Sequence, residues 1–262
     1  MTFVAKKSLG QNFLNDNKVI KIIADLGKID RNDLILEVGA GTGNLTEKIL
    51  EQSPKKLFVI EKDQRLALFL KEKFGDKINI FNEDMMKFEY ERYYKDKLII
   101  FGNLPYNIST QILAKWIKMK DLDKFCKKFV LMFQKEVADR IIAKTNTKNY
   151  GRLAILSQWK MNIEKVTDIE PNSFNPSPKV RSTLLTFVPK KKYLKLKDPK
   201  NLEHITNIFF SQRRKMVGKP LKILFTNFKE ISNELSIDLK LRPQNLDYET
   251  YYKICEIYET SI

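Results

Sequence analysis

Short apolar runs separated by longer amphipathic stretches characterise the sequence from residue 34 onwards. The runs end in polar or glycine-containing turns and lie at 34–38, 57–60, 78–81, 98–101 and 129–133. This is the pattern of strands that are buried on both faces of a parallel sheet. The stretches between them carry apolar residues at helical spacing, as in 63–74 and 110–119. The alternation predicts an α/β fold with a Rossmann-like, doubly wound and mostly parallel sheet.

The pattern changes after residue 189. Segments 161–169 and 182–188 predict a last strand pair, and late strands often give such a sheet an antiparallel edge. A charged sequence, Pro-Lys-Lys-Lys, then begins at residue 189, and beyond it apolar residues recur only at helical spacing. We therefore predict an α/β domain over 1–189 and a small all-helical domain over 190–262.

A glycine-rich loop, Glu37-Val38-Gly39-Ala40-Gly41-Thr42-Gly43, follows the first predicted strand. Glycines at this position allow a tight turn and let a ligand approach the backbone closely. The loop is not a dinucleotide fingerprint, which would need glycine in place of Asn44. It is not a phosphate-binding P-loop either, because Asn44 and Leu45 stand where that motif has Gly-Lys. It fits a nucleoside that carries no phosphate, and a plain tight turn is the alternative.

Acidic residues end the next two predicted strands. Glu61 lies about 20 residues past Gly41, from where a carboxylate reaches the two hydroxyls of a ribose. Asp84 follows the third strand, at a place suited to accept from an adenine amine of the same ligand. With Gly39, these residues predict a nucleoside cofactor site.

The fourth predicted strand ends in a segment suited to methyl transfer, Gly102-Asn103-Leu104-Pro105-Tyr106-Asn107. An exocyclic amine is a poor nucleophile because its lone pair is delocalised into the ring. The Asn103 side-chain carbonyl and the Leu104 backbone carbonyl are placed to accept its two hydrogens and so direct the lone pair towards a sulfonium methyl group. Pro105 stiffens the backbone, and Tyr106 offers a stacking face. The donor would be S-adenosylmethionine, and a strand-ending turn is the alternative.

The composition of the chain indicates a negatively charged partner and argues against membrane-bound, metal-binding and secreted proteins. The 262 residues carry a formal charge of +16 with a pI of about 9.6. This surplus favours a partner rich in phosphate groups, and a general compositional bias towards lysine is the alternative. The long basic amphipathic face of a membrane-surface protein does not stand out. Two cysteines and one histidine make a metal site improbable, so no metal is expected. We see neither a signal peptide nor a run of about 18 apolar residues, and expect a cytoplasmic protein.

Five motifs in order resemble those of the ribosomal RNA adenine dimethyltransferases, in particular the branch called KsgA. The similarity covers nearly the whole chain and implies a class I methyltransferase domain with an N-terminal arm over 1–14. The motifs are Leu9-Gly10-Gln11-Asn12-Phe13-Leu14, the loop 37–43, the segment 103–107, Phe174-Asn175-Pro176-Ser177-Pro178-Lys179-Val180, and Phe210-Ser211-Gln212-Arg213-Arg214-Lys215.

The resemblance implies roles for residues that the pattern alone does not assign. Gln11, Asn12 and Leu14 would touch the cofactor, together with Asn103, and Phe174 would stack on a flipped adenine opposite Tyr106. Taken alone, an aromatic residue in such a proline-rich loop is more often part of a core. Basic residues would grip RNA, at Lys179, Arg213, Arg214, Lys215, Lys219 and Lys222.

The implied activity is dimethylation of two adjacent adenosines near the 3′ end of small-subunit (16S) ribosomal RNA, on the RNA or on an assembling small subunit. A monomer is expected, with the helical domain binding RNA or the ribosome. One departure from the expected pattern is that Gly218 and Pro220 interrupt a segment where an unbroken helix is expected. The alternatives are an Erm-type methyltransferase of large-subunit RNA and a ribosome-assembly factor with the same fold that no longer transfers methyl groups.

Overall fold

The computed structural model describes residues 3–90 and 97–261, in a chain that divides into two compact units. The first unit comprises residues 1–138 and 162–189, and the second comprises residues 139–161 and 190–262. The division after residue 189 is also where the sequence changes pattern. Nothing in the sequence pattern indicated that residues 139–161 belong to the second unit and not to the α/β domain.

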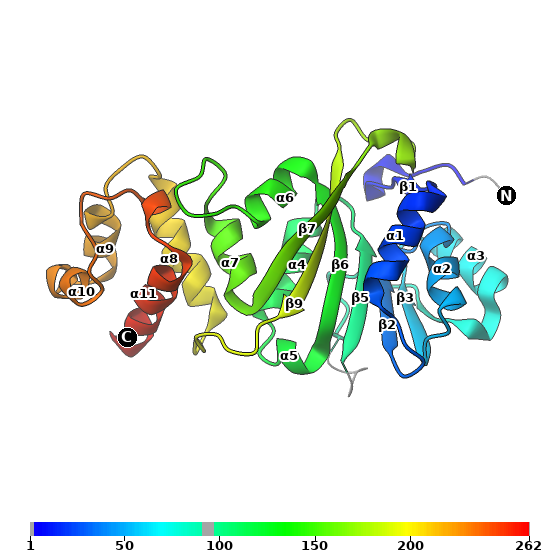
Figure 1. The fold of residues 1–262 in the computed structure, drawn as a ribbon, viewed down its shortest axis with the longest axis horizontal. Helices are drawn as coiled ribbons and strands as arrows, with labels where there is room; N and C mark the ends of the chain where they lie inside the picture. Colours follow the sequence, from blue (N-terminus) through cyan, green and yellow to red (C-terminus); the bar gives the residue numbers. More distant parts are fainter. Residues whose placement is uncertain (1–2, 91–96, 262) are drawn as a thin grey trace. The chain divides into compact units, whose positions relative to one another are not determined.

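A seven-stranded sheet forms the centre of the first unit, in the order β4-β3-β2-β5-β6-β9-β7 (Figure 1). Strands β4, β3, β2, β5 and β6 run parallel to their neighbours, and β9 pairs antiparallel with β6. The predicted mostly parallel, doubly wound sheet is thus confirmed. The strands are β2 (Leu34–Val38), β3 (Lys56–Ile60), β4 (Asn79–Phe81), β5 (Leu98–Asn103), β6 (Cys126–Gln134), β7 (Met161–Ile169) and β9 (Ser182–Pro189).

Helices connect these strands, as the spacing of apolar residues predicts. Two of them begin at aspartates: Asp16 accepts from the backbone of Lys18 and Val19, and Asp63 accepts from that of Arg65. The α-helices are α1 (Asn17–Gly27), α2 (Asn44–Glu51), α3 (Gln64–Phe74), α4 (Ser109–Lys118), α5 (Leu122–Phe125) and α6 (Lys135–Ile141). Short 3-10 helices are η1 (Lys7–Leu9), η2 (Gly75–Lys77) and η4 (Pro171–Ser173).

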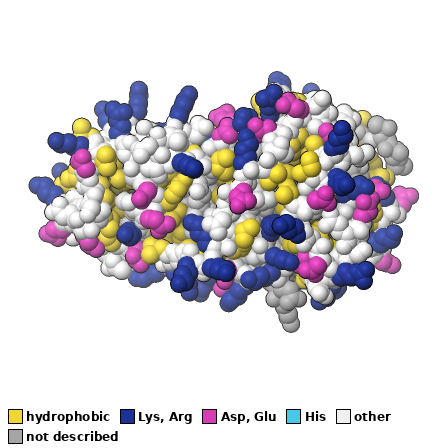
Figure 2. All heavy atoms as spheres, viewed as in Figure 1, with side chains coloured by type: hydrophobic (Ala, Val, Ile, Leu, Met, Phe, Trp, Pro, Cys, Tyr) yellow, Lys and Arg dark blue, Asp and Glu magenta, His cyan; other side chains and the backbone are white. Residues whose placement is uncertain are grey.

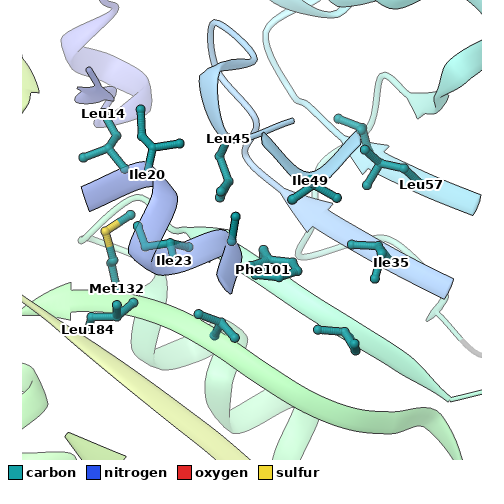
Figure 3. Close-up of a cluster of buried hydrophobic side chains, with 14 of the residues drawn as sticks. Leu14, Ile20, Ile23, Ile35, Leu45, Ile49, Leu57, Phe101, Met132 and Leu184 are labelled. Atoms are coloured by element: carbon teal, nitrogen blue, oxygen red, sulfur yellow. The ribbon is translucent and has the colours of Figure 1, made fainter. Parts of the chain in front are cut away.

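The sheet is buried on both faces. Along β6, Val130 and Met132 belong to a cluster that α1 and α2 cover (Figure 3), whereas Phe129 contacts Trp116 of α4, with the ring centres 5.1 Å apart. Alternate strand residues point to opposite faces. A strand between two helical layers therefore has apolar residues at successive positions, which explains the continuous run 129–133.

The N-terminal arm is joined to the proline-rich loop by a second, two-stranded sheet. In it, β1 (Phe13–Leu14) pairs antiparallel with β8 (Phe174–Asn175), with Leu14 opposite Phe174. Asn44 at the start of α2 also donates to the Leu14 carbonyl at 2.8 Å. The arm is thereby fixed to the first unit at its C-terminal end.

The second unit is helical. Helix α7 (Arg152–Lys160) packs against α8 (Pro199–Ser211) and α11 (Tyr248–Ser261), which explains why residues 139–161 belong to this unit. In its core the Phe209 and Tyr251 rings meet edge to face at 5.3 Å. The remaining elements are α9 (Gly218–Leu224), α10 (Phe228–Glu234) and η5 (Pro243–Asn245).

Gly218 and Pro220 do not interrupt a helix, as the sequence suggested, but lie in the first turn of one, and the break in the helical segment precedes them. Helix α8 ends at Ser211, and a new helix begins at Gly218, with Pro220 in its first turn. Proline is tolerated in a first turn because the N–H it lacks has no partner within the helix.

Neighbouring isoleucines on α1 test the contribution of the core. Ile23 is 1% exposed and lies in the cluster of Figure 3, whereas Ile22 is 43% exposed. We expect Ile23→Ala to lower the free energy of unfolding by about 2–5 kcal/mol and Ile22→Ala by less than about 1 kcal/mol. Urea denaturation measures both values. Equal losses would mean that α1 does not pack as described.

Candidate functional site

A cavity lies at the carboxyl ends of β2, β3, β4 and β5, where open α/β sheets bind ligands. Its walls come from the N-terminal arm, the loop after β2, the ends of β3 and β4, and the segment after β5. The residues predicted for cofactor or methyl transfer that line it are Gln11, Asn12, Leu14, Gly39, Gly41, Glu61, Asp84, Asn103, Leu104, Pro105 and Tyr106.

The glycine loop after β2 lines this cavity through Gly39, Ala40, Gly41 and Thr42. Gly41 has a φ of +59°, in the left-handed region that favours glycine. A Cβ atom added there would lie 3.0 Å from the Phe13 ring of the arm, so a side chain would push the arm away. The Gly41 N–H donates to Glu61 Oε2 at 3.0 Å, which ties the loop to the end of β3.

Glu61 presents a buried, oriented carboxylate to the cavity. It is 6% exposed, and its Oε1 accepts from the Asp63 N–H at 2.9 Å while Oε2 accepts from Gly41. Burial raises the pKa of Glu61, and the two backbone donors oppose that rise. Each carboxylate oxygen has a second lone pair, so the group can still accept from two ligand hydroxyls.

Asp84 lies after β4 and is more open to solvent. Its Oδ1 accepts from the Met86 N–H at 2.9 Å, and its Oδ2 pairs with Lys62 Nζ at 2.9 Å. The bond from Lys62 is the largest cause that lowers the pKa of Asp84. Asp84 is therefore an ionised acceptor at the rim of the cavity.

The amide of Asn103 has a defined orientation. Its Nδ2 donates to the Asn12 backbone carbonyl at 3.0 Å. In the part of the chain that the structure describes, no group donates to its Oδ1, so this oxygen is available as an acceptor. The arm thus places the side chain for which the sequence predicted a role in methyl transfer.

Tyr106 is held by a residue that sequence reasoning missed. Its hydroxyl shares a hydrogen bond of 2.5 Å with Oγ of Ser182, the first residue of β9. Ser182 is fully buried, which limits the positions open to the ring. A lone serine 76 residues further along the chain carries no sequence signal for this contact.

Phe174 lies in the core in this structure. It is 2% exposed, belongs to the same cluster as Leu14, and is not among the residues that line the cavity. This matches the plain interpretation of an aromatic residue in a proline-rich loop. Its stacking on a target base stays a prediction, and would require the side chain to leave the cluster.

The basic residues predicted to bind RNA differ in their surroundings. Figure 2 shows lysine and arginine side chains spread over the visible face, with fewer acidic ones among them. Lys179 is exposed in the first unit, and Arg214, Lys215, Lys219 and Lys222 are exposed in the second.

Arg213 is engaged within the second unit. Its Nη2 donates to the carbonyls of Lys148 at 2.6 Å and Thr147 at 3.3 Å, and its Nε donates to Gln244 Oε1 at 3.2 Å. Its guanidinium therefore ties together segments that are far apart in the sequence.

Glu37 is a buried acid with no predicted role. It is 2% exposed, Thr46 donates to its Oε2 at 2.6 Å, and it also lines the cavity. Burial raises its pKa to about 7, and the charge of Glu61 adds to the rise.

None of the described helices is long and apolar enough to cross a membrane.

Fold and site together define a class I methyltransferase: a parallel sheet with a glycine loop after its first long strand, an acid after the next, and an Asn-Leu-Pro-Tyr segment at the same edge. The sequence profile described as "Ribosomal RNA adenine dimethylase" matches residues 2–260. The chain belongs to the ribosomal RNA adenine dimethylase family and is an enzyme of the methyltransferase class.

Individual relatives agree with this assignment. The chain is 55% identical to a protein of Pelagibacter ubique named Ribosomal RNA small subunit methyltransferase A, over 97% of each chain. It is 37% identical to the protein of the same name from Ehrlichia chaffeensis, over 95% of each chain.

Two solved structures share the fold. A dimethyladenosine transferase from Plasmodium falciparum has a TM-score of 0.83 at 28% identity, covering 95% of this chain and 98% of that one. The 23S rRNA methyltransferase ErmE has a TM-score of 0.70 at 21% identity, covering 95% of this chain and 100% of that one. The second likeness concerns the fold alone.

Glu37 gives a test of the site's electrostatics. Because its folded pKa, about 7, lies above the ordinary value of 4.5, its contribution to stability is present below pH 4.5 and is lost as the pH rises through 7. We expect Glu37→Gln to gain about 1–3 kcal/mol of unfolding free energy relative to the parent between pH 5 and pH 8. Exposed Glu72→Gln is the control. Urea denaturation at several pH values in this range measures the unfolding free energy of each protein. If the free energies of Glu37→Gln and the parent change with pH in the same way, the raised pKa of Glu37 is refuted.

Proposed function

We propose that this enzyme uses S-adenosylmethionine to dimethylate the exocyclic amines of two adjacent adenosines near the 3′ end of small-subunit (16S) ribosomal RNA, on an assembling small subunit. The proposal includes a cytoplasmic location, where small subunits assemble, and action as a monomer.

The cavity wall fits this cofactor. Glu61 is a buried acceptor with lone pairs to spare, as a ribose diol needs, and Asp84 at the rim can accept from an adenine amine. Gly39 and Gly41 of the glycine loop line the same cavity, next to these acceptors. Bound there, S-adenosylmethionine supplies an electrophilic methyl group, and Gln11, Asn12 and Leu14 of the arm are proposed to contact it.

The orientation of Asn103 is the observation that carries the proposal. Because Asn12 occupies its Nδ2, the Oδ1 atom is left to accept one hydrogen of the target amine. The Leu104 carbonyl is proposed to accept the other. Two acceptors held by the backbone favour a pyramidal amine whose lone pair can attack, and they stabilise the positive charge that develops on nitrogen. No general base is required, since the methylated amine cation loses its proton readily.

Base recognition is proposed to depend on stacking. An adenine in folded RNA must leave its stack, at a cost of a few kcal/mol, before it can reach Asn103. The ring of Tyr106, fixed by Ser182, offers a face that recovers about 1–3 kcal/mol. Phe174 is proposed as the opposite face once it turns out of its cluster.

The names of the relatives support small-subunit RNA as substrate, since the two cited above are called small subunit methyltransferases. The likeness to ErmE concerns the fold alone and does not favour the Erm-type alternative. A factor without methyl-transfer activity is disfavoured because the site retains the acceptors and the glycine loop.

The Asn103→Ala variant tests the chemistry. It should lower methyl transfer by about 100-fold or more, because an acceptor that acts at the transition state is lost. Calorimetry should give a much smaller effect on S-adenosylmethionine binding, a rise in the dissociation constant of about tenfold at most, because only the bond that helps to fix the arm is lost on the cofactor side. Methylation at the parental rate would refute the role of Asn103. Mass spectrometry of 16S and 23S RNA after reaction with the parent protein shows which RNA is methylated. Preferential methylation of 23S RNA would favour the Erm-type function.

The exposed basic residues test RNA binding. We propose Lys179, Arg213, Arg214, Lys215, Lys219 and Lys222 as phosphate contacts. Arg214→Ala with Lys215→Ala should lower the slope of log affinity against log salt by about 1 per lost contact without changing thermal stability. Arg213→Ala should also lower the unfolding free energy, by about 1–2 kcal/mol, because its internal bonds are lost. A salt slope unchanged in the Arg214/Lys215 variant would place the phosphate contacts elsewhere.

A further inference from the structure

Asp63 brings together more side-chain donors than its role as the cap of α3 requires. Its carboxylate is fully buried, with 0% side-chain exposure. Oδ1 accepts from Lys6 Nζ at 3.2 Å and Arg65 Nε at 3.1 Å, and Oδ2 accepts from Gln11 Nε2 at 3.1 Å and Arg65 Nη2 at 2.7 Å. A buried carboxylate stays ionised only when it is paired in this way, and these bonds, that of Arg65 first, hold the pKa of Asp63 well below its usual range.

Two of these partners belong to the N-terminal arm. Within the arm, the Lys6 N–H donates to Gln11 Oε1 at 2.7 Å, so the two residues form one unit. Arg65 also donates to the Val4 carbonyl at 3.4 Å. The N-terminal part of the arm is therefore held to the start of α3 by side-chain contacts that converge on one carboxylate.

The arm is a bridge across the cofactor cavity. Its far end is fixed by β1, by Asn44 at the Leu14 carbonyl and by Asn103 at the Asn12 carbonyl. Residues 8–14 line the cavity, with Gln11 in the first attachment and Asn12 and Leu14 in the second. The other walls are loops that begin or end in the sheet, whereas the N-terminal end of this wall is held by side-chain contacts to Asp63 and Arg65.

Asp63 also touches the residue proposed to hold the ribose. Its backbone N–H donates to Glu61 Oε1 at 2.9 Å. The backbone of Asp63 thus orients Glu61 on the floor of the cavity, while its side chain holds the arm above. One residue therefore links the two sides of the cofactor site.

We propose that Asp63 is a positioning residue that keeps the N-terminal arm closed over the bound cofactor, and that its bonds to Lys6 and Gln11 break when the spent cofactor leaves. The inference rests on the proposed function for the identity of the ligand. It assigns Gln11 a second partner besides the cofactor and gives Lys6 and Asp63 a role in the rate of product release.

The rate of S-adenosylhomocysteine release tests this role. Asp63→Asn keeps the size of the side chain and a good helix cap but removes the charge. We expect release, followed by stopped-flow displacement, to become about tenfold faster. Lys6→Met should accelerate it by about twofold to fivefold, since Lys6 is 44% exposed and its ion pair is partly screened by solvent. Lys18→Met, on the exposed side of α1, is the matched control and should keep the parental rate.

Two further readouts separate positioning from general stability. Amides of residues 6–12 should exchange hydrogen faster in Asp63→Asn while those of β2 and β3 keep their protection. The double variant Lys6→Met with Asp63→Asn should release product no faster than Asp63→Asn alone, because both changes break the same contact.

The outcomes are distinct. If both single variants fold and release product at the parental rate, the role of Asp63 is refuted. If Asp63→Asn unfolds, Lys6→Met decides alone, since it alters only an exposed side chain. If the parent binds neither S-adenosylmethionine nor S-adenosylhomocysteine in calorimetry, the proposed function itself fails.

Discussion

The register of three parallel strands determines where the functional side chains lie. Val38 at the end of β2 pairs with Ile60 of β3 on one side and with Gly102 of β5 on the other. The three segments that follow therefore leave the sheet at one edge, side by side. The glycine loop, Glu61 and Asn103 converge there because the strands align, although no two of them are close in sequence.

Most of the fold could be predicted because a buried parallel strand has a strong local signature. Residues 34–38 and 98–101 are apolar at nearly every position, since both faces of the sheet are covered, and the structure places strands there. Glu61 and Asn103 could be predicted for the same reason: a polar residue directly after such a strand must lie at the edge where ligands bind. The position of these residues follows from the sheet, without knowledge of any distant contact.

What the sequence could not predict depends on contacts between distant segments. Ser182 fixes Tyr106 from another strand, and residues 139–161 join the helical unit because α7 packs on helices that come much later. Asp63 begins a stretch with helical spacing, yet nothing local indicates that Lys6 and Gln11 reach it. Each of these contacts requires the fold to be known first.

Three buried acids at the edge of the sheet differ in how their charge is compensated, and that difference decides what each can do. Asp63 is paired with cations, so its pKa is lowered and its acceptors are occupied by the arm. Glu37 has one hydroxyl donor, so burial raises its pKa to about 7. Glu61 lies between these cases: the backbone N–H groups of Gly41 and Asp63 donate to it, and none of the salt bridges found among the described residues involves it. It lines the cavity, and a ligand that brings two hydroxyls would add neutral donors that stabilise its ionised form.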